Sequence, residues 1–432
     1  MPERVGKGGR SDRGGLVIRV GLWRSADFLR LWAAQSISET GTQIGQLAVP
    51  LLAIGALHAS ATELGFLSSA RMLPFLLLSL PAGALLDRMR RLPVLVVSDV
   101  CRALLMAAVA VACVLGVLTL AQLYAAVLLV GVFTVAFDVS YQSYLPTLVR
   151  RESLADANAK LTASSSVAEM AGPAAAGVLV GVVGAAATVL LDALSFLASG
   201  LLCRAIRLQE PAPEAGGAVE GRSLRREIGE GLGFVLRRPV LRAVAASASL
   251  INLGSSMLMV LLTLYMVRTL GYSTTLVGVV FAVGGVGLVV GTLVTSRLIE
   301  RLGYGRSIVG GVVLCGVGMA VLPVASPGTA FGFLAGGQFL FGFGVPLFNI
   351  AQVTLRQFIT PARLQGRMNA SMRFVIWSTI AVGGPLAGFL AEAAGTRAAI
   401  AVGAAVGALS WLPLVGSSLL SLRELPAAHA QP

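Results

Sequence analysis

The sequence predicts an all-α polytopic membrane protein, with twelve transmembrane helices in two pseudo-symmetric six-helix bundles. Three observations lead to this fold class. Of 432 residues, 56% are hydrophobic and only 12% are charged, whereas soluble domains have about 25% charged residues. Basic residues are concentrated in alternate loops between apolar segments. One long polar segment divides the chain into two halves that resemble each other.

Twelve apolar segments are long enough to cross the hydrocarbon core of a bilayer, which takes about 20 helical residues. Several connections between them are very short, so consecutive helices must be neighbours in space. The predicted spans are 30–57, 62–86, 93–115, 119–142, 160–184, 186–206, 240–268, 275–298, 306–326, 329–355, 367–394 and 396–420.

The loop charges orient these spans. Basic loops are retained on the cytoplasmic side during membrane insertion, so we expect a multi-pass protein of the cell membrane with both termini in the cytoplasm. The net charge of +13 then faces anionic lipid rather than nucleic acid. The opposite loops carry only Arg268 and Arg397. The basic loops contain Arg88, Arg90 and Arg91; Arg150, Arg151 and Lys160; Arg297, Arg301 and Arg306; and Arg363 and Arg367.

A polar segment at 207–239 separates the two bundles. It begins with a Pro-, Glu- and Gly-rich stretch that cannot bury enough apolar surface to fold. Leu224, Ile228, Leu232 and Val235 then recur at helical spacing, which predicts an amphipathic helix at the membrane surface; a solvated linker helix is the alternative. The predicted organisation is a cytoplasmic tail at 1–29, an N-terminal bundle at 30–206, the linker at 207–239, a C-terminal bundle at 240–420 and a cytoplasmic tail at 421–432.

The two halves share a sequence pattern. Each contains a basic loop, then an Asn near the start of the next span (Asn158 and Asn369), then a Gly-Pro pair at 172–173 or 384–385. Because both halves have the same topology, the pattern predicts a parallel repeat about an axis along the membrane normal. Repeats of this kind place a substrate site between the halves, near the middle of the bilayer.

The loop between the second and third spans carries a charged motif. Gly83, Asp87, Arg88 and Arg91 match the form G-x-x-x-D-R-x-G-R-(R/K), and the chain therefore resembles the major facilitator superfamily; Arg90 stands where that family usually has Gly. A Gly allows two helices to approach closely. Asp87 can cap the next helix and pair with an Arg in one conformer only. The resemblance implies a conformational switch, with plain cytoplasmic charge as the alternative.

A second motif lies in the fifth span. Gly172, Pro173 and Gly177 resemble the G-x-x-x-G-P-x-x-G-G signature of the superfamily's antiporters, with Ala at two Gly positions. A Pro bends a spanning helix and small residues allow close packing, and both suit a hinge between half-domains; ordinary small-residue packing is the alternative. The same helix-break pattern recurs in the eleventh span at Gly384, Pro385 and Gly388.

Three short segments, 145–158, 191–196 and 224–232, resemble the drug/proton antiporter branch that includes the enterobactin exporter and macrolide efflux proteins. The resemblance to the superfamily covers essentially the whole chain. It implies the major facilitator fold, in which the first, fourth, seventh and tenth spans line the cavity.

Acidic residues inside predicted spans are candidates for proton coupling, because ionisable groups in a membrane are costly and usually functional. Glu39 lies about 14 Å into the first span at 1.5 Å per residue, and Asp138 and Glu169 lie in the fourth and fifth spans. Pairing with a basic residue for packing is the alternative, with Arg71 at similar depth to Glu39. Asp192, in the sixth span, is expected to be structural.

Polar residues in other spans are candidates for substrate contact, with interhelical hydrogen bonds as the alternative. No acid occurs between Glu230 and Glu300, so a carboxylate relay must lie mainly in the N-terminal half. We also expect Asp99 and Arg102 to pair at i, i+3 in the third span. The substrate-contact candidates are Gln43, Gln46, Arg71, Asn252, Gln338, Asn349, Gln352 and Arg373.

These features favour a monomeric secondary transporter that exports a hydrophobic or amphipathic small molecule in exchange for protons, without a cofactor. The alternatives are a proton-coupled importer of a nutrient or metabolite on the same fold and, more remotely, a non-transporting receptor. The absence of a phosphate-binding G-x-x-x-x-G-K-(S/T) loop disfavours an ATP-driven pump. An enzyme or metal site is disfavoured because the chain has only two His and its four Cys lie in apolar segments without close spacing.

Overall fold

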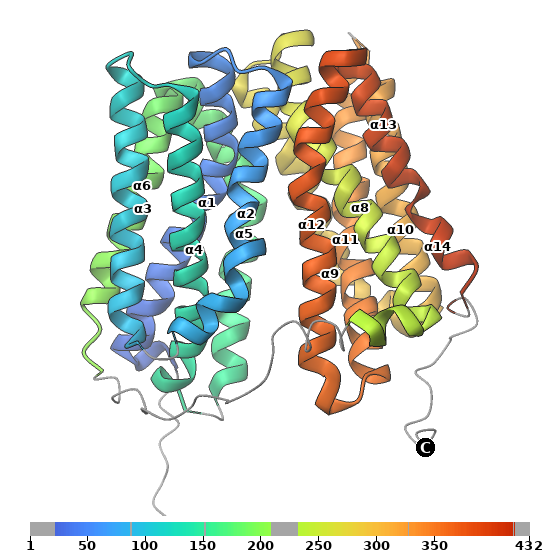
Figure 1. Ribbon diagram of the computed structural model, residues 1–432, viewed down its shortest axis with the longest axis horizontal. Coiled ribbons are helices and arrows are strands. Elements are labelled where there is room, and N and C mark those ends of the chain that lie inside the picture. The colour runs from blue at the N-terminus through green and yellow to red at the C-terminus, as the bar shows by residue number, and fades with distance from the viewer. Residues whose placement is uncertain are drawn as a thin grey trace, which may run out of the picture.

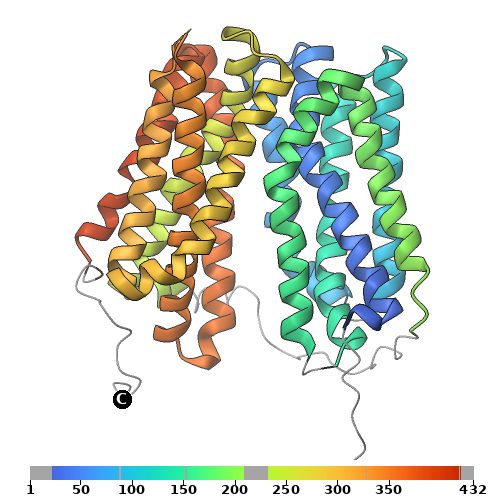
Figure 2. The ribbon, with the colours of Figure 1, turned by 180° about the vertical axis from the view of Figure 1, so that it is seen from behind.

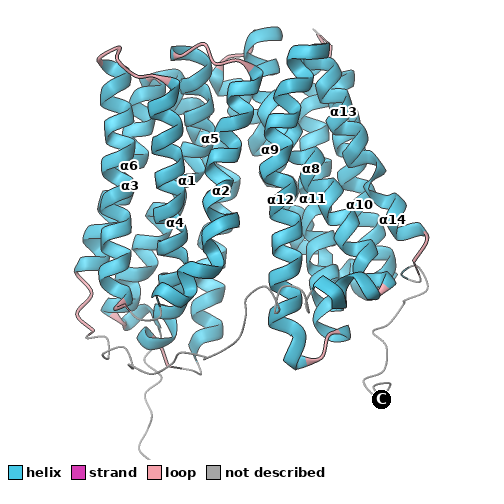
Figure 3. Ribbon diagram, viewed as in Figure 1, coloured by secondary structure: helices cyan, strands magenta, loops and turns pink. Residues whose placement is uncertain are grey.

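The computed structural model describes residues 22–86, 89–150, 153–208, 232–326, 328–417 and 419. In these ranges the chain forms helices and loops and no strand, as Figure 3 shows. Figure 1 shows two helical bundles side by side, the first coloured blue to green and the second yellow-green to red. The predicted all-α fold of two six-helix bundles is confirmed.

Each bundle contains six long helices. The first consists of α1 (Ala26–Ala56), α2 (Ala61–Leu86), α3 (Arg91–Val114), α4 (Leu120–Leu148), α5 (Leu154–Val183) and α6 (Ala185–Arg204). The second consists of α8 (Pro239–Leu264, continued by a π-helical turn Tyr265–Thr269), α9 (Thr274–Leu302), α10 (Tyr304–Val321), α11 (Ala330–Ile359), α12 (Ala362–Ala394) and α13 (Thr396–Ala408).

Eleven helices in the described ranges are long and apolar enough to cross a membrane. The remaining long helix, α1, has 31 residues but carries Glu39, Gln43 and Gln46 among its apolar side chains. These polar side chains lower the mean hydropathy of α1. A spanning helix tolerates them where it faces protein or a cavity rather than lipid. With α1, the count is the predicted twelve.

Several helices extend beyond the predicted spans at the end of the molecule that carries the basic loops, hereafter the basic end. α4 continues to Leu148 instead of 142, and α5 begins at Leu154 instead of 160. Hydropathy marks only the part of a helix that lies in hydrocarbon, whereas backbone hydrogen bonding continues into water. The predicted last span at 396–420 also differs, because α13 ends at Ala408 and is followed by a 3-10 turn (Leu409–Trp411) and α14 (Leu412–Val415).

The linker is described only at its end. Residues 232–237 are helical and Val235 is buried, while Leu224 and Ile228 of the predicted amphipathic helix lie outside the described residues. The first tail is described from Leu22 onward, where a 3-10 turn (Leu22–Arg24) precedes α1.

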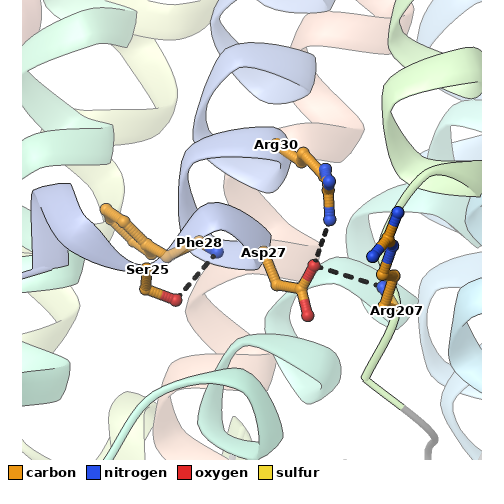
Figure 4. A network of polar contacts seen from close by, with 5 residues as sticks. All are labelled: Ser25, Asp27, Phe28, Arg30 and Arg207. Atoms are coloured by element: carbon orange, nitrogen blue, oxygen red, sulfur yellow. Dashed lines mark hydrogen bonds and ion pairs between the residues drawn. The ribbon is translucent and has the colours of Figure 1, made fainter.

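The start of α1 is tied to the end of α6 (Figure 4). Ser25 caps α1, because its Oγ accepts a hydrogen bond of 3.3 Å from the backbone N–H of Phe28. The Asp27 carboxylate pairs with Arg30 at 2.7 Å and accepts a 3.2 Å bond from the backbone N–H of Arg207. An acid in the first turn also complements the helix dipole.

The internal repeat is visible in backbone conformation. Gly184 joins α5 to α6 with φ 86° and ψ 162°, and Gly395 joins α12 to α13 with φ 89° and ψ 152°. These are equivalent positions in the two halves, and only glycine adopts such a conformation without strain. The same glycine hinge therefore links the fifth and sixth helices of each repeat.

Candidate functional site

A cavity of about 550 Å³ lies between the two bundles. Side chains from α1, α2, α3, α4, α5 and α6 line it on one side and from α8, α9 and α12 on the other. Its size is within the range of small-molecule sites, about 300–1,000 Å³. Most of the lining is apolar, and it includes Leu47, Leu67, Met72, Phe75, Met106, Val127, Val130, Met259, Val260, Phe281 and Ile380.

The acid of the first span faces this cavity. Glu39 lines it and its Oε1 accepts a 2.8 Å hydrogen bond from Nε2 of Gln43, one turn further along α1. The side chain is half-buried. Glu39 therefore keeps access to the cavity while one of its oxygens is held by a neutral donor.

Arg71 of α2 is half-buried in the same cavity and interacts electrostatically with Asp192 and Glu39. Asp192 of α6 is only 5% exposed, and its Oδ1 has no hydrogen-bond partner among the described residues. A buried charge is stable only when it is compensated. Arg71 thus interacts with two carboxylates that come from α1 and α6.

Asp138 of α4 lines the cavity near a second arginine. Arg102 of α3 interacts electrostatically with Asp138, and its guanidinium lies over the rings of Phe137 and Phe196, 4.5 and 4.4 Å from their centroids. Arg102 also forms an ion pair with Asp99 in the same helix, as the i, i+3 spacing predicts. Both side chains of this pair are buried.

The charged groups that line the cavity therefore all come from the N-terminal bundle. Three acids and two arginines from five helices surround one edge of an apolar chamber. The C-terminal bundle contributes neutral polar groups, namely Asn252, Ser255, Ser256 and Thr263, all from α8. The structure brings together in this cavity the predicted residues Glu39, Asp138, Arg71, Gln43, Gln46, Asn252 and Pro173.

Other predicted residues do not line the central cavity. Glu169 of α5 is exposed and is not a lining residue, but it interacts electrostatically with Glu39. Gln338 and Gln352 of α11 are buried away from it, and Nε2 of Gln352 donates a 3.4 Å bond to Asn349. Arg373 of α12 is exposed, with its guanidinium 4.4 Å from the ring centroid of Trp377, and it interacts electrostatically with Asp138 of the cavity.

Asp192 lines the cavity, although the sequence predicts a structural role for it. It reaches the cavity because α6 packs closely against α1, where Gly41 and Gly45 leave no side chain in its path: a Cβ on Gly41 would lie 2.8 Å from Oδ1 of Asp192. The sequence signal was the Gly-x-x-x-Gly spacing in α1, which indicates a close helix contact.

The bundles contact each other mainly through α2 with α12 and α5 with α9. On the first seam, Ser69 Oγ donates to the backbone oxygen of Ala381, and the rings of Phe66 and Phe389 meet edge to face with centroids 5.9 Å apart. These residues lie toward the end opposite the basic loops. Figures 1 and 2 show the bundles together at that end and spread apart toward the basic end.

The two Gly-Pro motifs occupy these two seams. A Cβ on Gly177 of α5 would lie 2.8 Å from the Cα of Gly278 in α9, and one on Gly384 of α12 would lie 2.7 Å from the backbone oxygen of Gly65 in α2. Gly388 packs against Thr62 of α2 on the same seam as Gly384, whereas Gly172 packs against Gln43 of α1 within the N-terminal bundle. Neither Pro173 nor Pro385 ends its helix.

The charged loop motif is described in part. Gly83 lies in the last turn of α2, and Arg91 is the first residue of α3. Asp87 and Arg88 lie outside the described residues.

Comparisons with known proteins agree with this architecture. The chain is 30% identical over 359 residues to the multidrug efflux pump Tap of Mycolicibacterium fortuitum, covering 79% of this chain and 83% of that protein. It is 29% identical over 368 residues to an uncharacterised MFS-type transporter of Sinorhizobium fredii, covering 83% and 87%.

Solved structures with the same fold include the nucleoside transporter NupG, with a TM-score of 0.73 at 11% identity over 90% of this chain and 99% of that one. A bacterial homologue of the iron transporter ferroportin in an inward-facing state gives a TM-score of 0.73 at 18% identity over 90% and 98%. The sequence profile of the Major Facilitator Superfamily matches residues 31–383 and 244–431. The chain belongs to the Major Facilitator Superfamily and is a multi-pass membrane transporter, not an enzyme.

Proposed function

We propose that this protein is a proton-coupled exporter of hydrophobic or amphipathic small molecules that works by alternating access. The observation that carries the proposal is the cavity between the bundles, which combines a mainly apolar lining with the carboxylates of Glu39 and Asp138. An apolar chamber of this size suits a lipophilic ligand. Carboxylates partly removed from water are suitable groups for proton exchange.

The orientation of the protein is part of the proposal. With the basic end in the cytoplasm of the cell, both termini are cytoplasmic, and the bundles are closed toward the outside and open inward. An exporter collects its substrate in this state. The resemblance to the multidrug efflux pump Tap supports an outward direction of transport.

The proposed coupling involves Glu39 and the proton-motive force, with no cofactor and with the monomer as the transporting unit. Arg71 interacts electrostatically with both Glu39 and Asp192. When Glu39 binds a proton, its attraction to Arg71 is lost, and Arg71 is left to Asp192. A change of partner of this kind can bias one arrangement of the helices over another.

The competing proposal is import of a nutrient or metabolite on the same fold, which the structural likeness to the nucleoside transporter leaves open. The cavity argues against an anionic nutrient, because its two arginines are each already matched by acids, Arg71 by Asp192 and Glu39, and Arg102 by Asp99.

Transport of ethidium into everted membrane vesicles tests direction and coupling together. An exporter accumulates ethidium in energised everted vesicles, and a protonophore abolishes the accumulation. Glu39→Gln is expected to stop accumulation driven by a pH gradient while exchange of ethidium between equal concentrations continues.

Glu300→Gln is the matched control, because Glu300 is exposed at the end of α9 and away from the cavity. Its accumulation should equal that of the wild type. Full active transport by the Glu39→Gln variant would show that Glu39 takes no part in proton coupling. A higher ethidium content in whole cells that express the protein would contradict export.

A further inference from the structure

A second cavity of about 500 Å³ lies at the basic end of the N-terminal bundle, between α1, α4 and α5. It adjoins the central cavity, because Gln35 and Glu39 line both. Its remaining lining consists of Ser36, Tyr141, Gln142, Leu145, Pro146, Leu154, Asn158, Leu161, Thr162, Ser164 and Ser165.

This cavity, hereafter the polar cavity, has polar and apolar lining in about equal parts, whereas the lining of the central one is mainly apolar. Nine of its thirteen lining residues carry a hydroxyl, amide, carboxyl or phenol group. Among the described residues that line it, Glu39 is the one charged side chain. An anionic ligand group would find no cation here, whereas hydroxyl groups and an ammonium would find acceptors on every side.

Some of these groups already have partners and others do not. Ser164 Oγ accepts a 2.9 Å bond from the indole N–H of Trp32, and the Asn158 amide N–H donates 2.9 Å to the backbone oxygen of Leu154. By contrast, Oε1 of Gln35 and Oγ of Ser36 are buried without a hydrogen-bond partner in the described part of the chain. A change of side-chain rotamer that turns either atom toward a ligand donor would recover the free energy that an unpaired buried polar atom costs.

The two cavities meet at an aromatic wall. Tyr141, in the polar cavity, is stacked on Phe137, in the central cavity, with centroids 6.2 Å apart and an interplanar angle of 8°. Phe137 is itself covered by Arg102. A ligand that extends from one cavity into the other therefore passes a continuous ring surface on α4 and the Glu39 carboxylate on α1.

From this geometry we infer that the polar cavity is a binding subsite for the hydroxyl- and amine-bearing part of an amphipathic substrate whose apolar part occupies the central cavity. The ligand class is a hydrophobic ring system joined to an amino sugar or a similar neutral or cationic polar group. The inference rests on the proposed function, since it extends the same transport site.

Paired ligands test the subsite. Doxorubicin carries an amino sugar on an apolar ring system, and doxorubicinone is the same ring system without the sugar. Their affinities for the full chain in lipid nanodiscs are measured by fluorescence titration. Two or three added hydrogen bonds to the polar lining groups predict that the wild type binds doxorubicin roughly tenfold tighter than doxorubicinone.

The double variant Ser36→Ala, Thr162→Val removes two hydroxyls from the polar cavity at nearly constant volume. It is expected to reduce the affinity ratio of doxorubicin to doxorubicinone to within about twofold. Thr162→Phe, which fills the cavity, should have the same effect. The control Thr292→Val changes an exposed threonine of α9 outside both cavities and should preserve the ratio.

Equal affinity of the two compounds for the wild type, or an unchanged ratio in both polar-cavity variants, would overturn the subsite and leave the proposed export function standing. Failure of either compound to bind a wild-type chain that elutes as a single species on gel filtration would overturn the subsite together with the proposed apolar chamber. Gel filtration of each variant separates loss of binding from loss of fold.

Discussion

Gly177 of α5 and Gly278 of α9 lie against each other across the boundary between the two bundles, so closely that a Cβ on either would come within 2.9 Å of the other's Cα. Thr275 of α9 adds a 3.5 Å hydrogen bond to the backbone oxygen of Gly177. This backbone-to-backbone contact closes the molecule at the end opposite the basic loops.

A larger side chain at Gly177 should therefore block this closed arrangement. Gly177→Leu forces a side chain into the backbone of α9, and overpacking of this kind costs about 1–3 kcal/mol. That cost shifts the equilibrium between closed and open arrangements by a factor of about 5 to 150. We expect the initial rate of transport in proteoliposomes to fall at least as much.

The control for this variant is Gly310→Leu in α10, where an added Cβ meets nothing within 4 Å. Its transport rate should stay near that of the wild type. A Gly177→Leu protein with an unchanged rate would show that transport does not require this close contact.

The electrostatic interaction between Arg71 and Asp192 should be measurable as a coupling energy. Asp192→Asn and Arg71→Gln each remove one charge from a buried neighbourhood that also contains Glu39. Because the two groups interact, the double variant should lose less stability than the sum of the single variants, by about 0.5–3 kcal/mol. Denaturant unfolding in detergent micelles measures the free energies.

The pair Arg71→Gln and Asp156→Asn provides the reference, because Asp156 is exposed and paired with Lys160 at the basic end of α5. Those two substitutions should be additive within about 0.5 kcal/mol. If the losses in free energy of unfolding are also additive for Arg71→Gln and Asp192→Asn, the Asp192 carboxylate does not compensate the charge of Arg71.

Two intrahelical ion pairs of similar sequence spacing should differ greatly in their importance for stability. The Asp99–Arg102 pair in α3 is buried, with side-chain exposures of 0% and 3%, whereas Asp156 of the Lys160 pair is 56% exposed. Asp99→Ala removes the ion-pair partner of the buried Arg102 and should lower the free energy of unfolding by about 3–5 kcal/mol. Asp156→Ala should cost about 0–1 kcal/mol.

The same unfolding titration measures both variants. Equal losses for the two would show that water reaches Arg102 through the central cavity and replaces its lost partner.

The sequence was sufficient to predict the features that depend on contact with lipid, above all the positions of the membrane spans. Hydropathy located the spans, but it did not locate the helix ends beyond the bilayer, such as the last turns of α4, since backbone hydrogen bonds there do not depend on apolar side chains. The repeat of the Gly-Pro pattern indicated two equivalent halves, and Gly184 and Gly395 have the same backbone conformation in both.

The sequence could predict that a residue lines the cavity where this depends on its depth along a helix, as for Glu39 and Asp138. It could not do so where the rotation of the helix and the identity of its neighbours decide whether the residue lines the cavity. Glu169 is in the right span and exposed outside the cavity, while Asp192, in an outer helix, reaches the cavity past Gly41 and Gly45.

By itself, the sequence determined the membrane environment, the number of helices and the two-fold repeat, because these follow from apolar length, loop charge and internal similarity. Only the tertiary structure decided which buried charges meet. Arg71 interacts with both Glu39 and Asp192, and Glu39 also lines the polar cavity, because helices from distant parts of the chain pack at particular rotations that no local pattern specifies.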